Sequence, residues 1–130
     1  MAKEILTVDD SNMITFLWKM VLEQEGYVVT QVKDGETALT LLNAGNHYDC
    51  IIVDQHMDGM NGLELAGQIR AMPTRRLVPI IMITADRAEQ LREDGRKIGI
   101  NARLIKPVNP RDLLDIVNRL CPTTFRANKE

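Results

Sequence analysis

The stretch CIIVDQHMDGMNG, residues 50–62, joins a short apolar run to an acidic loop that contains two glycines. The run CIIV is short and rich in β-branched residues, which is typical of a buried β-strand. Asp54 follows it directly, so the predicted strand places a carboxylate at the start of the loop. What this carboxylate does depends on which other residues the chain brings beside it.

A short apolar run followed by an amphipathic stretch occurs five times along the chain. Strands are predicted at 4–8, 27–32, 50–54, 78–84 and 102–106, and helices at 12–25, 35–45, 62–72, 87–98 and 110–120. Parallel strands need long crossovers, and these crossovers are right-handed. Five such units in series therefore predict an α/β fold, a doubly wound five-stranded parallel sheet with helices on both faces.

Residues that commonly begin or end helices flank the predicted segments: Gly26, Asp34, Gly45, Asn109 and Pro110. Asp86 and Glu89 match a capping box at the start of the fourth helix. The basic run RAMPTRR, residues 70–76, is interpreted as a solvated loop rather than a nucleic-acid site. The signals at the helix ends thus agree with the hydrophobic pattern.

Length and charge restrict the class of protein. The chain has 130 residues, a length that matches one domain with a sizeable core. Its 16 basic and 18 acidic residues give a net charge of −2, so no global positive field attracts nucleic acid or anionic lipid. We expect no direct nucleic-acid binding.

The expected location is cytoplasmic. The N-terminal segment MAKEILTVDD has neither a basic region nor a long apolar region, and no apolar run approaches the ~20 residues that span a bilayer. Cys50 and Cys121 form no metal-binding or redox spacing and suit a reducing compartment. Cys50 is interpreted as a small core residue, and no membrane insertion is expected.

Polar residues gather where the predicted strands end. In an open parallel sheet, ligands bind outside the carboxyl ends of the strands. At those ends the chain places Asp9, Asp10, Asp54, Thr84, Lys106 and Pro107. Taken singly, each has an ordinary explanation, such as a helix cap for Asp10 or a solvated cation for Lys106. Together, groups from four of the five strands predict a site at one edge of the sheet.

The chemistry of these groups points to phosphoryl transfer. Three carboxylates at one edge raise one another's pKa unless a cation compensates, and Mg²⁺ suits carboxylate ligands with several waters. An ionised Asp54 could then attack an electrophilic phosphorus, as carboxylates do when they form aspartyl phosphates. Lys106, Thr84 and loop N–H groups would supply donors to the phosphoryl oxygens.

These residues resemble the response-regulator receiver domain of two-component signalling. The matching motifs are VDD at 8–10, DQHM at 54–57 with Gly62, TA at 84–85 and KP at 106–107. The resemblance covers the chain from Lys3 to about Leu120. It implies a flavodoxin-like sheet with strand order 2-1-3-4-5, a receiver domain over residues 1–122 and a C-terminal tail over 123–130. The chain is similar to stand-alone, chemotaxis-regulator-like receivers.

The resemblance implies that Asp54 is phosphorylated by a histidine kinase or a histidine phosphotransfer protein, in a Mg²⁺-dependent reaction without enzymatic turnover. Asp10 would bind Mg²⁺ directly and Asp9 mainly through water. Asp54 and the backbone carbonyl of His56 would complete the protein ligands. Two-component signalling and phosphorelay are therefore the expected processes.

The resemblance also implies roles in transmitting the signal. Thr84 would be the switch hydroxyl, and Lys106 the cation that senses the phosphate. The Lys106–Pro107 bond is expected to be cis, as cis bonds are essentially confined to proline. Phosphorylation would then shift an existing equilibrium at the face formed by the fourth helix, fifth strand and fifth helix. No effector domain is expected to follow, so the output would be a downstream protein, and the chain a monomer or weak dimer.

Two positions depart from the usual pattern of the family. Asp58 stands where proline is common, and it is either a further pocket carboxylate or a solvent-facing loop residue. Arg103 stands where an aromatic ring commonly moves inward on activation, and burying a charged guanidinium there would be costly. Arg103 is therefore expected to face a partner protein, to pair with Asp86 in one state, or to be only solvated.

The first predicted helix, over residues 12–25, is apolar over an arc of roughly 240°, wider than the ~100° that a surface helix commonly buries. Either the helix packs on two sides or part of the arc is exposed. Receivers that resemble this chain contact their histidine partner through this helix. Ile14, Leu17 and Trp18 are the predicted contact residues.

Two other classes of protein share part of this chemistry or this fold class. A phosphatase of the haloacid dehalogenase type also forms an aspartyl phosphate with Mg²⁺, but its nucleophile belongs to a D-x-D motif after the first strand. This chain has adjacent aspartates there and no D-x-D motif. A flavin or nucleotide binder of this fold class would need a glycine-rich loop after a strand, which is missing. The receiver remains the preferred interpretation, with the phosphatase as the alternative.

Overall fold

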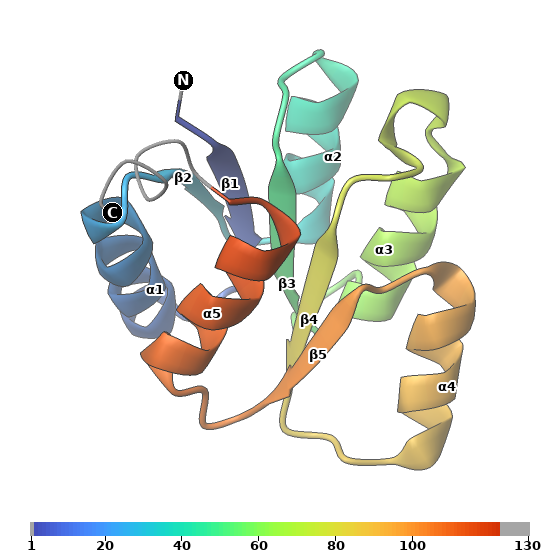
Figure 1. Ribbon diagram of the computed structural model, residues 1–130. Coiled ribbons are helices and arrows are strands. Elements are labelled where there is room, and N and C mark those ends of the chain that lie inside the picture. Colours follow the sequence, from blue (N-terminus) through green and yellow to red (C-terminus); the bar gives the residue numbers. More distant parts are fainter. Residues whose placement is uncertain (1, 123–130) are drawn as a thin grey trace.

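The structure is a computed structural model that describes residues 2–122, apart from the side chains of residues 12–15. In this part of the chain, five parallel strands form one sheet in the order β2-β1-β3-β4-β5 (Figure 1). The strands are β1 (Glu4–Val8), β2 (Val28–Val32), β3 (Cys50–Asp54), β4 (Ile80–Thr84) and β5 (Ala102–Ile105). The predicted fold class and strand order are confirmed, and the predicted tail, 123–130, lies outside the described residues.

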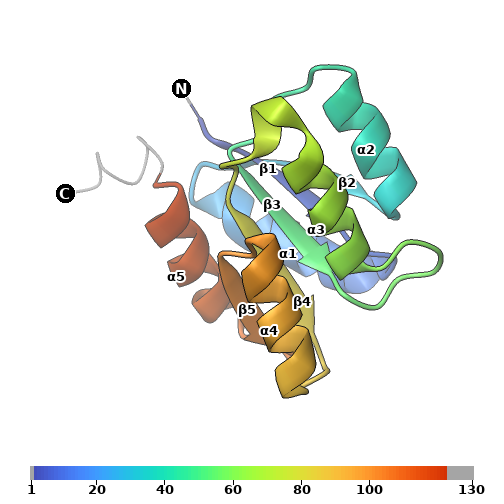
Figure 2. The same cartoon turned by 90° about the vertical axis from the view of Figure 1, so that its right-hand side faces the viewer.

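Helices cover both faces of the sheet (Figures 1 and 2). They are α1 (Asn12–Gln24), α2 (Gly35–Asn43), α3 (Gly62–Ala71), α4 (Glu89–Ile98) and α5 (Pro110–Leu120), with a short 3₁₀ helix, η1 (Pro73–Arg75), after α3. Helices α1 and α5 pack on one face, while α2, α3 and α4 pack on the other. None of the helices in the described part of the chain has the length and apolar character needed to cross a lipid bilayer.

The central strands are buried on both faces, which explains their nearly continuous apolar sequences. Every residue of β3 and β4 is buried. Ile51 and Val53 contribute to the core under α2 and α3, whereas Cys50 and Ile52 contribute to the core under α1 and α5. Cys50 is thus a core residue, as expected, and β3 holds Asp54 rigidly at its carboxyl end.

Most helix ends follow the predicted signals. The Asp34 side chain accepts a hydrogen bond from the N–H group of Thr37 at the start of α2. Asn109 caps α5, whose first residue is Pro110. Gly26 and Gly45 have positive φ angles after α1 and α2, where glycine pays no steric cost. These predictions from single residues are confirmed.

The predicted capping box of α4 is wrong. Ala88 is the N-cap residue of α4 and makes no side-chain cap, while Asp86 accepts a hydrogen bond from the N–H group of Ala88 in the preceding loop. The capping box of this protein lies instead at the start of α3, between Asn61 and Glu64. The Asp86 side chain therefore forms an aspartate turn within the β4–α4 loop, and α4 begins three residues later, at Glu89.

The basic run at 70–76 is not a solvated loop. Arg75 is buried, and its Nη2 donates to the carbonyl oxygen of Leu42, in the last turn of α2, at 3.1 Å. Arg70 Nη2 donates to the carbonyl oxygen of Gly99, just after α4, at 2.8 Å. Helix C-termini carry unpaired carbonyls and a partial negative charge, which favour arginine. These two arginines therefore stabilise the ends of neighbouring helices.

Candidate functional site

Asp54 ends β3 as a buried carboxylate with one cationic neighbour. Its side chain is 2 % exposed, and Lys106 Nζ lies 3.0 Å from its Oδ1. Asp54 pairs in the sheet with Ile83 of β4, while Lys106 directly follows β5. The ends of β3 and β5 thus bring together the carboxylate and the lysine that the sequence predicted for one site.

Asp9 and Asp10, which follow β1, complete an acidic cluster with Asp54. One ligand oxygen from each of the three carboxylates lies within 4.8 Å of the others. Asp9 and Asp54 are buried, whereas Asp10 is exposed. Asp9 Oδ1 accepts a hydrogen bond from Ser11 N at 2.7 Å, but Asp9 Oδ2 is buried and has no hydrogen-bond partner.

The electrostatics of the cluster call for a cation. The pKa of Asp9 is raised to about 6, mainly by burial. The hydrogen bond from Ser11 N lowers this pKa, while the negative charges of Asp54 and Asp10 raise it further. Lys106 lowers this pKa but is one positive charge among three carboxylates. Hard oxygen donors, a net negative charge and one unpartnered buried oxygen fit a divalent cation such as Mg²⁺.

Thr84 and Lys106 are linked at the adjoining edge of the sheet. Thr84 is fully buried, and its carbonyl oxygen accepts a hydrogen bond from Lys106 N at 2.9 Å. Its hydroxyl oxygen accepts a hydrogen bond from Asp86 N, also at 2.9 Å. The Lys106–Pro107 peptide bond is cis, as expected. Thr84 therefore connects the region of Lys106 with the loop that leads to α4.

The backbone after Asp54 is fixed by the start of α3. Gly62 N donates to Gln55 O at 3.1 Å, and Leu63 N donates to the side-chain oxygen of Gln55 at 2.8 Å. Gln55 was not predicted as a site residue. It lies eight residues before Leu63, too far along the chain for a local capping pattern to reveal it.

A cavity of about 370 Å³ opens beside the acidic cluster. Asp10, His56 and Asp58 are among its lining residues, and all three are exposed. Asp58 therefore fits both interpretations, because it is a further carboxylate lining the pocket and it is also exposed to solvent. The His56 side chain is not part of the cluster of metal-ligand atoms, and the predicted use of its backbone carbonyl stays a prediction.

Part of the apolar arc of α1 is exposed, as predicted, but Trp18 is not. Phe16, Leu17 and Met20 are exposed, whereas Trp18 is 3 % exposed and packs in the core between α1 and the sheet. An apolar groove of about 390 Å³ runs from Leu17 past the Trp18 ring to Lys106 and the loop after it. The side chain of Ile14 lies outside the described side chains. The exposed part of α1 therefore adjoins the lysine of the acidic site.

Arg103 lies apart from the acidic cluster, on the side of β5 that faces α4. It pairs in the sheet with Met82, and its side chain is half-buried. Its Nη1 is buried without a hydrogen-bond partner, so part of the guanidinium is buried despite the predicted desolvation cost. In the described part of the chain no ion pair joins Arg103 and Asp86.

Comparisons with known proteins agree with this geometry. The family model of the response regulator receiver domain matches residues 5–118. Transcriptional regulatory protein SrrA of Staphylococcus aureus is 35 % identical over 130 residues, which are 100 % of this chain and 52 % of that protein. The chain therefore spans about half the length of the curated relatives it matches.

Solved structures of similar proteins share the whole fold. Chemotaxis response regulator CheY4 of Vibrio cholerae superposes with a TM-score of 0.85 at 31 % identity, over 92 % of this chain and 99 % of that one. A response regulator receiver protein from Pseudomonas putida gives a TM-score of 0.85 at 27 % identity, over 92 % and 98 % of the two chains.

Proposed function

The chain belongs to the response regulator receiver domain family, and we propose that Asp54 is its phosphoacceptor. The observation that carries this proposal is the position of Asp54. It is a buried carboxylate paired with Lys106 at 3.0 Å, and its ligand oxygen lies within 4.8 Å of those of Asp9 and Asp10. The receiver domain would span residues 1–122 and act as a signalling component rather than a classical enzyme.

The phosphoryl donor in this proposal is a phosphohistidine of a histidine kinase or a histidine phosphotransfer protein. A carboxylate oxygen of Asp54 attacks the phosphorus, the phosphorus–nitrogen bond breaks, and the leaving imidazole takes up a proton. The ion pair with Lys106 Nζ, at 3.0 Å, would help to hold the Asp54 carboxylate in position for this attack. Catalysis then rests on positioning and on electrostatic stabilisation of the phosphoryl oxygens.

Receiver domains bind Mg²⁺ at such an acidic cluster, and we propose that Asp9, Asp10, Asp54 and the His56 carbonyl hold the ion here. When bound, Mg²⁺ would neutralise negative charge around the incoming phosphoryl group. Asp9 suits this role because its Oδ2 is buried without a partner. Asp10 suits it because its exposed carboxylate lines the open cavity beside the cluster.

Thr84 would transmit the phosphorylated state to α4. In the present conformation its hydroxyl oxygen accepts a hydrogen bond from Asp86 N. If the side chain of Thr84 turns so that its hydroxyl donates to a phosphoryl oxygen, Oγ1 moves. The hydrogen bond that Oγ1 accepts from Asp86 N must then lengthen or break. The β4–α4 loop would then rearrange, and the equilibrium between two conformations of α4, β5 and α5 would shift.

The exposed apolar surface of α1 is the proposed docking site for the histidine protein. Leu17 lies beside the groove that reaches Lys106, and Phe16 and Met20 extend the exposed surface. Trp18 would form only the floor of this site, and Ile14 remains a predicted contact. The downstream partner would be a protein, with no direct nucleic-acid contact, no membrane insertion, a cytoplasmic location and a monomeric or weakly dimeric state.

Phosphorylation by acetyl phosphate in Mg²⁺ buffer tests the proposal. One phosphoryl group per chain is expected for the wild type and for Asp58→Asn, a control that removes an exposed carboxylate of the same loop. None is expected for Asp54→Asn or in excess chelator. Steady hydrolysis of small phosphoesters would instead favour the haloacid dehalogenase alternative. The described residues do not favour that alternative, because the carboxylate paired with Lys106 ends β3 rather than following β1.

A further inference from the structure

Both cysteines of the chain lie at the edge of the sheet opposite the acidic cluster. Cys50 is the first residue of β3, and Cys121 directly follows α5. Helix α5 returns along the sheet after β5, so its last turn lies near the start of β3 (Figure 1). The two thiols form a hydrogen bond with each other. The fold thus brings together two cysteines whose spacing in the sequence matches no redox motif.

The pair lies in the core between the sheet and helices α1 and α5. Cys50 is fully buried, Cys121 is 6 % exposed, and both belong to the same hydrophobic cluster. Cys121 N donates to Val117 O at 2.8 Å, and the carbonyl oxygen of Cys121 accepts a hydrogen bond from the Tyr27 hydroxyl at 3.0 Å. These contacts hold the backbone of Cys121 beside the start of β3.

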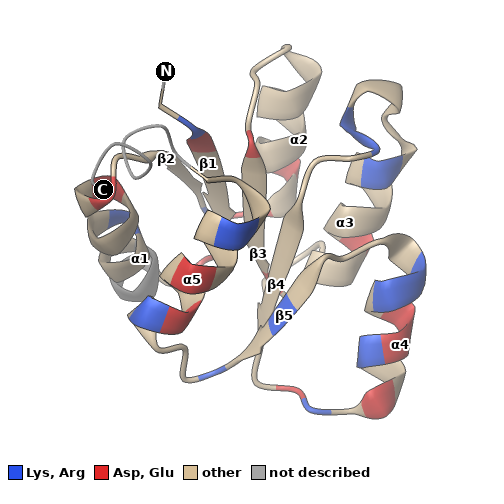
Figure 3. Cartoon of the chain, viewed as in Figure 1, with Lys and Arg blue, Asp and Glu red and all other residues tan. Residues whose placement is uncertain are grey.

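The two thiols differ in their readiness to ionise. The hydrogen bond from Cys50 lowers the pKa of Cys121, although burial opposes this effect. The same hydrogen bond, together with burial, raises the pKa of Cys50. Acidic and basic residues surround this edge of the sheet (Figure 3), and their effects on Cys121 oppose each other, since Asp49 raises its pKa and Lys3 lowers it. Cys121 is therefore the thiol that more readily forms a thiolate, the form that reacts with oxidants.

Cys121 is also the easier of the two to reach. It lies at the end of a helix, where local opening costs less free energy than in a central strand. Cys50 lies in β3, every residue of which is buried. A small oxidant would therefore meet Cys121 first.

We propose that Cys50 and Cys121 are a redox modification site, in which a peroxide links the start of β3 to the end of α5 through a disulfide. The Cys121 thiolate attacks one oxygen of hydrogen peroxide, the oxygen–oxygen bond breaks, and a sulfenic acid forms. The Cys50 sulfur then attacks the Cys121 sulfur, and the sulfenic oxygen leaves as water. Two thiols are oxidised, and one peroxide is reduced to two waters that take up the protons of both thiols.

The first step prepares the second. The hydrogen bond to Cys121 is the largest cause of the raised pKa of Cys50, and this bond is weakened when Cys121 becomes a sulfenic acid. The site uses no group of the acidic cluster, because Asp54 is the last residue of β3, about 13 Å along the strand from Cys50. In a reducing compartment such a disulfide is usually transient and senses oxidants.

The test treats the reduced full chain with hydrogen peroxide at neutral pH without denaturant, and then labels the remaining thiols with N-ethylmaleimide after unfolding. The wild type should lose about 2 Da, the mass of two hydrogen atoms, and take up no label. Dithiothreitol should restore both thiols, and non-reducing peptide mapping should show a link between Cys50 and Cys121. Asp54→Asn should react equally, so the result does not depend on the proposed phosphoacceptor.

Two variants separate the steps of the reaction. Cys50→Ala should stop at a sulfenic acid on Cys121, which dimedone traps, because the second thiol is missing. Cys121→Ala should react with peroxide at least ~10-fold more slowly than Cys50→Ala, because its remaining thiol is fully buried and has a raised pKa in the wild type. The wild-type mapping decides the question even if a variant does not fold.

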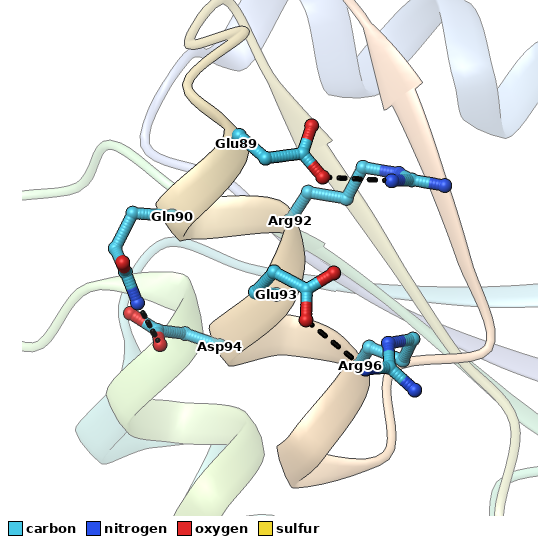
Figure 4. A network of polar contacts seen from close by, with 6 residues as sticks. All are labelled: Glu89, Gln90, Arg92, Glu93, Asp94 and Arg96. Carbon is cyan, nitrogen blue, oxygen red and sulfur yellow. Dashed lines mark hydrogen bonds and ion pairs between the residues drawn. The ribbon is translucent and has the colours of Figure 1, made fainter.

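Amide signals of the ¹⁵N-labelled wild type locate the structural effect. Oxidation should shift the signals of residues 50–52 and 117–121 and raise the melting temperature by several degrees, because the unfolded chain is constrained. Signals of α4 should stay in place, since α4 packs on the other face of the sheet. The ion pairs of α4, Glu89 with Arg92 and Glu93 with Arg96, also lie within the helix itself (Figure 4).

Three results would overturn the proposal. The first is a wild type that keeps both thiols at a peroxide dose that oxidises a small free thiol in the same solution. The second is a disulfide that forms only between two chains, or only after unfolding in urea. The third is oxidation of Cys121 to a sulfinic acid in the wild type without a link to Cys50, which would show that the two sulfurs do not react with each other.

Discussion

Gly62 lies so close to Asp54 that a Cβ atom at position 62 would be only 2.6 Å from the carbonyl oxygen of Asp54. Real Cβ atoms essentially never approach another atom this closely, and the obstacle is backbone rather than a movable side chain. Gly62 N also donates to Gln55 O at 3.1 Å. Glycine therefore allows the first turn of α3 to press directly on the strand end that holds the proposed phosphoacceptor.

Gly62→Ala should destabilise the fold by about 1–3 kcal/mol, because the backbone at Asp54 must move to admit the methyl group. It should also slow phosphorylation by acetyl phosphate. Urea unfolding and the initial phosphorylation rate measure the two effects. Gly67→Ala in the same helix is the control, since a Cβ there meets nothing within 4 Å, and it should raise stability by up to about 1 kcal/mol. Equal stability of the two variants would contradict the close approach at Gly62.

The sequence was most informative about elements with strong local signals. Strands β1 and β3 and helix α5 occupy the predicted residues, and the other element boundaries lie within two residues of their predictions, because apolar period and caps are local properties. Asp9, Asp10, Asp54 and Lys106 were predicted to meet because strand ends of a parallel sheet share one edge. The structure brings these four together.

Features that depend on contacts between distant segments were not predictable in this way. Trp18 is buried because α5 and β2 approach α1, although its position in the helix gave no sign of which part of the apolar arc would be covered. Arg75 looked like a solvated loop residue until the end of α2 supplied carbonyl acceptors. The partial burial of Arg103 likewise depends on how α4 packs against β5.

The free energy of unfolding in chelator should decrease as pH rises through about 6. Asp9 has a folded-state pKa of about 6 against an ordinary value of 3.8, mainly because it is buried. Since the folded-state pKa is raised, folding favours the protonated form, and this stabilisation is complete below the ordinary pKa and lost above about 6. The protein should be about 1 kcal/mol less stable near pH 7 than near pH 5.

Urea unfolding at the two pH values measures this difference, and Asp9→Asn isolates it from other titrating groups. The variant should lack this decrease between pH 5 and pH 7. If the free energy of unfolding of the wild type and of Asp9→Asn changes equally between pH 5 and pH 7, Asp9 does not have a raised pKa.

Leu17→Glu should slow phosphorylation by a histidine kinase at least tenfold, because it places a charge in the apolar surface beside Lys106. Phosphorylation by acetyl phosphate should change little, since Leu17 is not part of the acidic cluster. Leu77→Glu is the matched control, because Leu77 is 91 % exposed and lies near the opposite ends of the strands, before β4. If Leu17→Glu and Leu77→Glu slow the kinase reaction equally, α1 is not the docking surface.

Lys106→Ala should retain some phosphorylation but lose the structural response. The lysine pairs with Asp54 through its side chain and bonds to Thr84 through its backbone, so its removal should uncouple the phosphate from β5. Beryllofluoride, a mimic of the phosphoryl group, should shift amide signals of residues 89–105 in the wild type and much less in Lys106→Ala. Identical shifts in both proteins would mean that the signal reaches α4 without Lys106.

The identity of the phosphorylated residue tests the central claim most directly. After reaction with acetyl phosphate and Mg²⁺, borohydride reduces an aspartyl phosphate to homoserine, and peptide mass spectrometry locates the converted residue. The site described here predicts conversion at Asp54 alone, dependent on Mg²⁺, because Asp54 is the carboxylate that pairs with Lys106 within the acidic cluster. Conversion at Asp9, Asp10 or Asp58, or undiminished labelling of Asp54→Asn, would contradict the assignment of Asp54 as the phosphoacceptor.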